Sequence, residues 1–322
     1  MASARSVRRF VLEAGQPRER LDKALSRLMP GTSRATIQRW IAEGRILLAG
    51  ESCRARDSVQ AGSVIEVEPG PPPPSRAEPD ASVELSVLYE DAHLVVIDKP
   101  VGMVVHPARG HARGTLVNGL LARFARPPSD PRDAEGPMRP GIVHRIDKDT
   151  SGVLVAARDE RTREGLKAQF SKHSVERAYR AICVGVPRQG TIRTPHGRDP
   201  RSRLRFSSRV ERGREAVTHV ALVEKLAGGR ASLVECRLET GRTHQIRVHL
   251  SEQTRTPILA DRLYGGVPHD PALRDIAEEL GRQALHAAVL GFSHPVDQRW
   301  LRFEAPLPVD MQRALDRLRV LD

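Results

Sequence analysis

Asp147 lies in the most informative stretch of the sequence, residues 141–158, which read G-I-V-H-R-I-D-K-D-T-S-G-V-L-V-A-A-R. β-Branched residues on both sides of a Lys-Asp-Thr-Ser-Gly run predict two short strands joined by a turn. Alternation along the first strand would place Arg145 and Asp147 on the same face. A carboxylate beside a guanidinium at the end of a strand is a common way to mount a reactive group on a rigid support. A solvated ion pair on an exposed strand is the alternative interpretation.

Tyr179 is a second candidate, on a strand that the alternation of residues 175–184 predicts. Arg177 shares its face, and Arg180 follows the tyrosine directly. Because the chain has only three tyrosines and two tryptophans, an aromatic residue beside two arginines stands out. Its functional interpretation is stacking on a nucleic-acid base. Its structural interpretation is an ordinary strand aromatic at the edge of the core, and spacing alone leaves both open.

Arg247 is a third candidate, within residues 238–250, which read L-E-T-G-R-T-H-Q-I-R-V-H-L. Alternation predicts a strand here, with a polar face made of Thr243, Gln245, Arg247 and His249. His244 and His249 would then lie on opposite faces, which excludes one metal ion held by both side chains.

A Ser–His hydrolase built from Ser151 and His144 is an alternative chemistry. The nucleophile elbow of such enzymes requires a glycine two positions before the serine, and Asp149 stands there instead. The sequence therefore gives this alternative little support.

The composition indicates a polyanionic partner. Lys and Arg total 52 against 40 Asp and Glu, which gives a formal net charge of +12 and a pI near 10.5. Nucleic acid is the first candidate. Nine arginines lie within residues 188–214, an excess that indicates either a surface tracking a nucleic-acid backbone or an ordinary charged hairpin.

Cysteine usage and hydropathy indicate a cytoplasmic protein. Cys53, Cys183 and Cys236 are too few and too scattered for a disulfide framework, and no C-x-x-C suggests a zinc site. No apolar run approaches about 20 residues, and the N-terminus lacks the apolar core of a signal peptide. We therefore expect neither membrane insertion nor secretion.

The N-terminal part predicts a small RNA-binding domain. Apolar residues at helical spacing predict a helix over residues 20–29 and a second around Ile37, followed by strands at 45–48 and 63–67. This helix–helix–strand pattern with basic helices resembles the domain first recognised in a ribosomal protein of the small subunit, the S-four type. Six prolines within residues 69–80 exclude helix and central strand there. We expect an S-four-type domain over 18–70, a linker over 71–84 and a second domain over 85–322.

The second domain mixes predicted strands and helices. Apolar residues 94–97 predict a buried strand, and a turn follows in which Lys99 is either a surface lysine or a phosphate contact. Helical spacing predicts helices over 159–172 and 275–290, and a closing strand is expected over 300–303.

The motifs, in this order, resemble those of the RluA/RluD family of pseudouridine synthases from about residue 20 to the C-terminus. The central H-R-I-D-K-D-T-S-G is close to the family's H-R-L-D-x-x-T-S-G, and the K-P-V-G that begins at Lys99 matches its K-P-x-G. V-E-R-A-Y-R-A, residues 175–181, matches the tyrosine-bearing strand, with Arg177 where the family usually has lysine. G-R-T-H-Q-I-R, residues 241–247, matches the later arginine motif, and the L-H-A from Leu285 also fits.

The resemblance implies a role for each candidate residue. Asp147 corresponds to the catalytic aspartate, Tyr179 to the tyrosine that stacks on the base, and Arg247 to the arginine that pairs with the catalytic carboxylate. Arg145 corresponds to the arginine that fills the gap left by a flipped base. The implied fold is α+β, with a mostly antiparallel mixed central sheet flanked by helices and loops. Its active cleft would be lined by the strands bearing Asp147, Tyr179 and Arg247.

The implied function is that of an RNA pseudouridine synthase acting on large-subunit ribosomal RNA without a cofactor or metal. The sequence does not show the oligomeric state, and a monomer is the default expectation. The reaction is an isomerisation, because the glycosidic C–N bond breaks, the uracil turns, and a C–C bond forms to the same anomeric carbon. Asp147 could trap the ribose covalently or remove a ribose proton, and the sequence does not choose between these routes. The alternative is an RNA-binding ribosome-assembly factor with a vestigial active site, against which the intact central motif argues.

Overall fold

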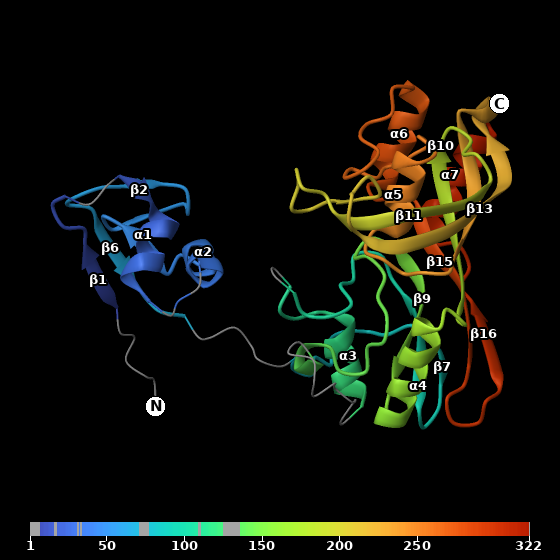
Figure 1. Ribbon diagram of the computed structural model, residues 1–322, viewed down its shortest axis with the longest axis horizontal. Helices are drawn as coiled ribbons and strands as arrows, with labels where there is room; N and C mark the ends of the chain where they lie inside the picture. Colours follow the sequence, from blue (N-terminus) through green and yellow to red (C-terminus); the bar gives the residue numbers. More distant parts are fainter. Residues whose placement is uncertain are drawn as a thin grey trace. The chain divides into compact units, whose positions relative to one another are not determined.

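The computed structural model describes residues 7–15, 18–30, 32, 34–70, 77–108, 111–124 and 136–321. They fall into two units, Met1–Ser75 and Arg76–Asp322, each with its own hydrophobic core (Figure 1). Residues 71–76 of the expected linker lie outside the described residues. Its remainder is bonded to the second unit, because Ala77 N donates to Pro137 O and the Asn118 side chain donates to Glu78 O.

Two helices and a small antiparallel sheet form the first unit. The helices are α1 (Leu21–Leu28) and α2 (Arg34–Ala42), which confirms both helices predicted from apolar spacing. The sheet order is β1-β6-β3-β4, with β1 at Arg8–Val11, β6 at Val64–Val67, β3 at Ile46–Leu48 and β4 at Glu51–Ser52. A separate pair joins β2 (Glu19–Arg20) to β5 (Ser58–Val59). Leu25, Ile37 and Ile65 are fully buried in the shared core.

A buried carboxylate engages part of the basic surface expected on these helices. Asp22 is fully buried and accepts hydrogen bonds from Arg20 and Arg34. Burial raises the pKa of Asp22, but the hydrogen bonds from Arg20, Arg34 and Gln38 outweigh it and lower the pKa to about 2. Asp22 therefore ties the start of α1 to the start of α2.

Ten strands form one mixed sheet in the second unit. Its order is β12-β11-β13-β14-β10-β15-β9-β8-β7, and β16 also pairs with β15. The strands are β7 (Val87–Glu90), β8 (Leu94–Lys99), β9 (Ser151–Ala157), β10 (Glu176–Val184), β11 (Gly190–Arg198), β12 (Phe206–Ser207), β13 (Arg214–Leu226), β14 (Ala231–Leu238), β15 (Leu285–Ser293) and β16 (Trp300–Glu304). Within the described part of the chain, only β15 with β9 is a parallel pairing. The predicted α+β class with a mostly antiparallel mixed sheet is confirmed.

Helices flank this sheet toward both of its ends (Figure 1). They are α3 (Leu116–Arg123), α4 (Glu160–Ser171), α5 (Gln245–Glu252), α6 (Pro271–Leu280) and α7 (Val309–Arg319), with short 3₁₀ turns at Gly136–Met138 and Ala227–Gly229. The predicted helix over residues 159–172 is confirmed by α4, whose first turn is capped by the Asp159 side chain accepting from Thr162 N.

The predicted helix over residues 275–290 is wrong in its second half. The helix α6 ends at Gly281, which adopts a left-handed conformation with φ +69°, and residues from Leu285 onward form β15. β15 lies in the middle of the sheet, so both of its faces are buried and its apolar run has no alternation to reveal a strand.

β15 brings the strand after Asp147 beside the strand of Tyr179. It pairs antiparallel with β10 and parallel with β9, where Ala287 lies opposite Gly152. Gly152 has φ +114°, and a methyl group added there would overlap the Ala287 carbonyl oxygen. The T-S-G glycine therefore permits the close approach of two backbones that sets the spacing of the site.

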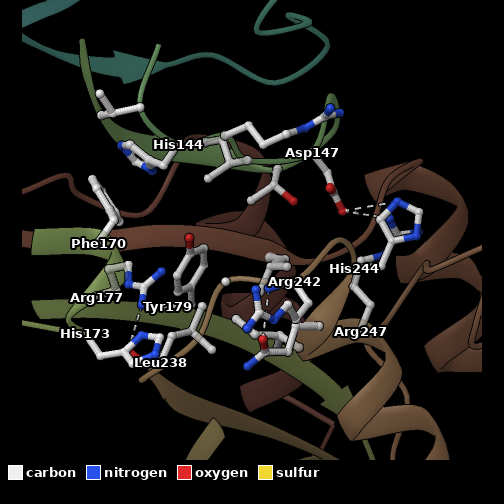
Figure 2. Close-up of a pocket in the computed structure, with 18 of the residues that line it drawn as sticks. His144, Asp147, Phe170, His173, Arg177, Tyr179, Leu238, Arg242, His244 and Arg247 are labelled. Carbon is white, nitrogen blue, oxygen red and sulfur yellow. Dashed lines mark hydrogen bonds and ion pairs between the residues drawn. The ribbon is translucent and has the colours of Figure 1, made fainter. Parts of the chain in front are cut away.

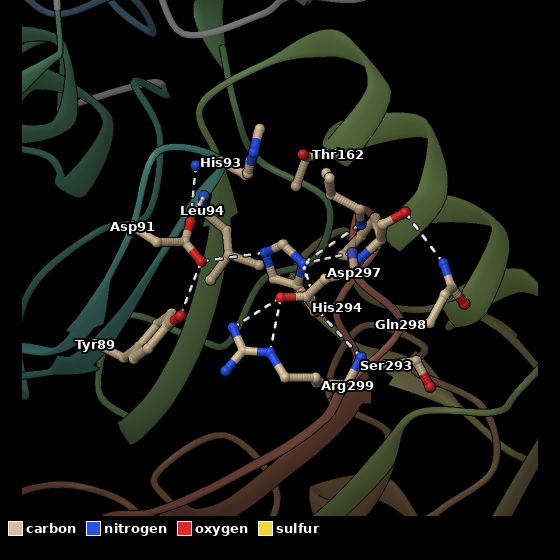
Figure 3. A network of polar contacts seen from close by, with 12 residues as sticks. Tyr89, Asp91, His93, Leu94, Thr162, Ser293, His294, Asp297, Gln298 and Arg299 are labelled. Atoms are coloured by element: carbon tan, nitrogen blue, oxygen red, sulfur yellow. Dashed lines mark hydrogen bonds and ion pairs between the residues drawn. The ribbon is translucent and has the colours of Figure 1, made fainter.

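A polar cluster joins the β7–β8 turn to the β15–β16 turn (Figure 3). His294 lies between Asp91 and Asp297, with nitrogen–oxygen distances of 3.1 Å to each. Tyr89 donates to Asp91 at 2.9 Å, and Arg299 donates to Asp297 at 2.7 Å. The cluster holds together two turns that are far apart in the sequence. None of the helices in the described ranges combines the length and the apolar content needed to cross a bilayer.

Candidate active site

Asp147 lies on an irregular segment, and the strand predicted over residues 142–147 is wrong. Only Ile142 pairs, through a single antiparallel bridge to Ala156. The next backbone donor of β9, Val155 N, is bound by the side chain of His144 at 3.1 Å instead of by a strand partner. An imidazole acceptor therefore ends the ladder, and the chain runs free of the sheet up to the turn at Lys148.

Lys99 fixes the turn that follows Asp147. Its side chain is 0% exposed, and Nζ donates to the carbonyl oxygens of Pro100, Met103 and Lys148 at 2.7, 2.9 and 3.0 Å. These three bonds use all three ammonium donors. Both interpretations of Lys99 from the sequence, as a surface lysine and as a phosphate contact, are therefore wrong.

Burial and the neighbouring carboxylates have opposite effects on the pKa of Lys99. Burial lowers its pKa to about 8, and the nearby carboxylates of Asp149 and Asp147 oppose that effect. Arg282 adds a further contact to the turn, with Nη1 donating to the carbonyl oxygen of Asp149 at 3.2 Å. The segment that carries Asp147 is thus positioned by side chains from outside it.

Arg247 lies on α5, and the strand predicted around it is wrong. His244, in a left-handed conformation with φ 59°, precedes the first helical residue, Gln245. Ile246 and Leu250 are buried at i, i+4 spacing, which the alternating polar residues concealed in the sequence. The side chain of Gln245 stabilises the start of the helix by accepting from Arg242 N.

Arg247 joins two carboxylates. Its Nη1 donates to Asp147 Oδ2 at 2.8 Å, while Nε and Nη2 donate to the two oxygens of Asp261 at 2.7 and 2.9 Å. Asp261 is fully buried and also accepts from the backbone of Leu263 and Tyr264. Burial opposes the charge of Arg247, but the hydrogen bonds from Arg247 to Asp261, with Asp147 adding, raise the pKa of Arg247 above its ordinary value.

His244 is a second nitrogen group near the Asp147 carboxylate. Its Nε2 lies 3.9 Å from Asp147 Oδ2, and its Nδ1 lies 2.8 Å from the Tyr264 hydroxyl. That hydroxyl accepts from Phe206 N, so its own hydrogen is free to point at Nδ1. We assign the Nε2–H tautomer on this network, which directs an N–H toward Asp147.

Tyr179 lies on β10, as the alternation of residues 175–184 predicted. The residue is 9% exposed, and its hydroxyl points into a pocket that Asp147 and Arg247 also line (Figure 2). Burial raises the pKa of Tyr179, with Arg177 opposing and Asp147 adding to the effect. The tyrosine is therefore a pocket wall as well as a core residue.

One pocket of about 420 Å³ collects all four candidate residues, Arg145, Asp147, Tyr179 and Arg247. They come from three kinds of element, so the expected cleft lined by three strands is wrong. Asp147 comes from an irregular segment, Tyr179 from a strand and Arg247 from a helix (Figure 2). Arg145 is exposed, and Asp147 pairs with Arg247 rather than with Arg145.

Comparisons with known proteins show the family of this chain. Residues 93–252 match the family model of RNA pseudouridylate synthase, and residues 19–65 match that of the S4 domain. A ribosomal large subunit pseudouridine synthase D of Xanthomonas campestris pv. campestris is 44% identical, with 98% of this chain and 93% of the relative covered. The chain belongs to the RNA pseudouridylate synthase family.

Two further relatives show how widely this likeness extends. An uncharacterized RNA pseudouridine synthase of Bacillus subtilis is 42% identical, with 94% of this chain and 95% of the relative covered. The solved structure of human RNA pseudouridylate synthase domain containing 4 is 26% identical with a TM-score of 0.52, and 73% of this chain and 93% of that chain are covered. The pseudouridylate synthases are isomerases acting on RNA, and the S4 domain is an RNA-binding module.

The structure does not assemble the Ser–His hydrolase that the sequence left as an alternative. Ser151 is buried and contacts Nδ1 of His286 at 2.9 Å, not His144. The ring of His144 stacks on Phe170 with its centroid 4.5 Å away. Among the described residues, no group of three or more His, Cys, Asp or Glu side chains could hold a metal ion.

Sequence reasoning missed three residues that shape this pseudouridylate synthase site: Lys99, His244 and Asp261. Lys99 and His244 stand within motifs that the sequence showed, yet their contacts join segments far apart in the chain. Asp261 stands outside the motifs that were matched, and only its two hydrogen bonds with Arg247 reveal it.

The arginines of residues 188–214 lie mostly on the surface. Eight of the nine are exposed and Arg205 is half-buried. Some already have partners, such as Arg193, which pairs with Glu215 at 2.7 Å. A surface that tracks RNA and a charged hairpin are both compatible with this exposure, so the RNA-binding interpretation stays a prediction.

Proposed function

We propose that the chain converts specific uridines of large-subunit ribosomal RNA to pseudouridine, with Asp147 as the group that carries the chemistry. The observation that carries the proposal is the Asp147 carboxylate, held by Arg247 at 2.8 Å in a pocket that Tyr179 also lines. The choice of RNA rests on relatives named ribosomal large subunit pseudouridine synthase D, from Xanthomonas campestris and Xylella fastidiosa among others.

Each candidate residue has a part in the reaction. Asp147, hydrogen-bonded by Arg247, acts on the ribose, either by attacking the anomeric carbon or by removing a ribose proton. The target base leaves its stack, which costs a few kcal/mol, and stacks on Tyr179. Arg145, exposed beside the pocket, fills the gap that the base leaves in the RNA. No step requires a cofactor, because the product is an isomer of the substrate.

The domains divide this work. We propose that the S4-type domain over residues 18–70 supplies RNA affinity, that residues 71–84 link it, and that residues 85–322 carry out the isomerisation. The protein would act as a monomer in the cytoplasm, where ribosomal RNA is modified. The high positive charge of the chain, +12, supports RNA as the partner.

The decisive test is Asp147→Asn, assayed on ribosomal RNA from cells that lack the gene. We expect the rate of pseudouridine formation to fall by at least about 1,000-fold, because the amide is neither a nucleophile nor a base. Asp275→Asn is the matched control, since Asp275 is exposed on α6 and does not line the pocket. Wild-type conversion by the Asp147→Asn protein would overturn the proposal. Full rescue of growth and ribosome profiles by that protein would instead favour the assembly-factor alternative.

A further inference from the structure

Arg177 is a buried cation in the pocket wall, and no carboxylate among the described residues pairs with it. Four arginines are buried among the described residues, and they are Arg163, Arg177, Arg247 and Arg282. The other three pair with carboxylates: Arg163 with Glu160 and Glu164, Arg247 with Asp147 and Asp261, and Arg282 with Asp310. Arg177 is 8% exposed, and within the described ranges its side chain donates only to the backbone carbonyls of Leu238 and Glu239, at 3.4 and 2.6 Å.

The remaining donors of Arg177 are unused. Both bonds come from Nη2, Nε is buried without a partner, and Nη1 has none in the described part of the chain. Burial lowers the pKa of Arg177, yet a guanidinium stays protonated in proteins. A buried charge with idle donors costs free energy, and such a group calls for an explanation.

Neighbouring residues hold the guanidinium at the pocket. Its carbon lies 5.5 Å from the centre of the Phe170 ring, and a methyl group at Gly241 would come within 2.7 Å of Nη1. Gly241 opens the G-R-T-H-Q-I-R motif, so its missing side chain makes room for Arg177. The arginine is thus seated in a prepared position.

Arg177 and Asp147 lie on opposite sides of Tyr179. Figure 2 shows the tyrosine ring between Arg177 on one side and Asp147 with Arg247 on the other. All four residues line the same pocket. A uracil stacked on Tyr179 with its ribose at Asp147 would therefore direct the edge of the base that is distant from the sugar toward Arg177. This edge carries N3 with a carbonyl group on each side.

We propose that Arg177 donates a hydrogen bond to a carbonyl oxygen of the target uracil and stabilises the negative charge of the uracil once it is detached, an inference that rests on the proposed function. When the N1–C1′ bond breaks, its electron pair stays on the ring and spreads over N1 and the two carbonyl oxygens. Arg177 keeps its protons throughout. After C5 bonds to C1′, C5 loses its proton to water and N1 takes one up, so the reaction balances as an isomerisation.

The symmetry of uracil explains why one donor suffices. Replacing N1 by C5 at the sugar requires a half-turn about the axis through N3 and C6, which exchanges the two carbonyl groups. Arg177 therefore meets an oxygen before and after the turn. Cytosine carries an amino group in place of one oxygen, so the same turn would bring a donor against a donor, which selects uracil.

A backbone phosphate is the other group in RNA that an arginine could bind, and we expect it to contact the rim of the pocket. Arg214 is exposed and lines the same pocket, so it can meet the sugar–phosphate chain outside. Arg177 is buried beside the tyrosine, where a flipped base would lie. The burial of the two arginines thus separates a phosphate contact from a base contact.

The test uses the full chain and transcripts of large-subunit ribosomal RNA that contain uridine or 5-fluorouridine. In single turnover with excess enzyme, Arg177→Gln should lower the rate on uridine RNA by about 100-fold, as for loss of one donor to a developing charge. Arg177→Lys should recover part of it. Fluorine stabilises the detached ring anion. The reduction of the rate by Arg177→Gln should therefore be at least about fivefold smaller on 5-fluorouridine RNA than on uridine RNA, with the disappearance of the N-linked nucleoside as the measurement. Arg180→Gln, from the same strand but outside the pocket, should keep the wild-type rate.

The outcomes distinguish the possible roles of Arg177. An Arg177→Gln rate within about threefold of wild type would overturn the inference. An unchanged rate with a binding constant less dependent on salt would assign Arg177 to a phosphate. Equal losses on both RNAs, with a lowered unfolding temperature, would assign it a purely structural role. An inactive wild-type protein would instead remove the proposed function, and this inference with it.

Discussion

The two ends of the pocket are built on opposite electrostatic principles. At the Asp147 end, Arg247 lies between two carboxylates and donates hydrogen bonds to both of them. At the Arg177 end, a buried guanidinium faces the pocket, and its acceptors in the part of the chain that the structure describes are backbone carbonyls. The first end is pre-organised before RNA arrives, because its groups need no substrate to be satisfied. The second end is completed only by a ligand that brings an acceptor.

This difference separates stability from activity. Removing a member of the paired end leaves an uncompensated buried charge, so both properties should fall together. Removing the unpaired cation relieves a buried charge, so stability should hold while activity falls. The two ends can therefore be distinguished by measuring unfolding and turnover on the same variants.

Arg247→Gln should have the largest effect. It leaves Asp261 buried without its cation, so we expect the free energy of unfolding to fall by about 3–5 kcal/mol. We also expect the single-turnover rate to fall by about 1,000-fold, because Asp147 loses the hydrogen bond from the Arg247 guanidinium. Denaturant unfolding and pseudouridine formation measure the two effects. A stable, active variant would show that the paired end is not a functional unit.

Asp261→Asn should come next. The amide keeps the size of the side chain but loses the charge that orients Arg247, so we expect the rate to fall by about 10- to 100-fold, the range known for positioning partners of site residues. Asp275→Asn, on the exposed face of α6, is the matched control and should match wild type. A loss of RNA affinity at an unchanged maximal rate would contradict a positioning role.

His244→Gln should reduce the rate by about tenfold, by removing the N–H directed at Asp147. It should also change the pH dependence of stability. Burial lowers the pKa of His244, although Asp147 opposes that effect, so the unfolded chain binds this proton more readily than the folded one. Wild-type stability should therefore decline as pH falls below about 6.5, and the variant should lack that part of the decline. If thermal unfolding showed the same pH dependence of stability for wild type and His244→Gln, the contribution assigned to His244 would be contradicted.

Arg177→Met should have the smallest effect on stability and so sharpens the contrast with Arg247. The apolar chain fills similar space over Phe170 without a charge, so the free energy of unfolding should stay equal or rise by up to about 2 kcal/mol. Activity should still be lost. A clear destabilisation in denaturant unfolding would show that Arg177 stabilises the fold in the absence of substrate, contrary to the inference.

Local patterns predicted the site where neighbours in the sequence are also neighbours in space. The strand of Tyr179 followed from alternation, because β10 pairs on both sides, with β14 and with β15, and stays a strand through the register shift at Ala178/Tyr179. The segment of Asp147 did not, because the interruption comes from His144 binding the backbone of Val155, a contact that propensity cannot show. Arg247 was misplaced because the spacing of its motif fits both a strand and a short helix.

Buried charges were the least predictable features. Lys99 looked like a surface residue beside a turn, and its burial depends on two carbonyls of that turn and on a third, that of Lys148, which the fold brings from a distant segment. The pairing of Arg247 with Asp261 and the missing partner of Arg177 are likewise properties of the assembled pocket. Composition and motifs gave the family and the four candidate residues, whereas the electrostatic contrast between the two ends required coordinates.

The position of β15 governs when this enzyme can become active during its synthesis. β15 lies between β9 and β10, yet it follows both of them in the chain. A nascent polypeptide therefore exposes two apolar strands that cannot yet meet, and the aspartate and tyrosine walls have no fixed spacing until β15 emerges from the ribosome. Growing chains should accordingly be inactive until β15 has been synthesised and has paired with both strands.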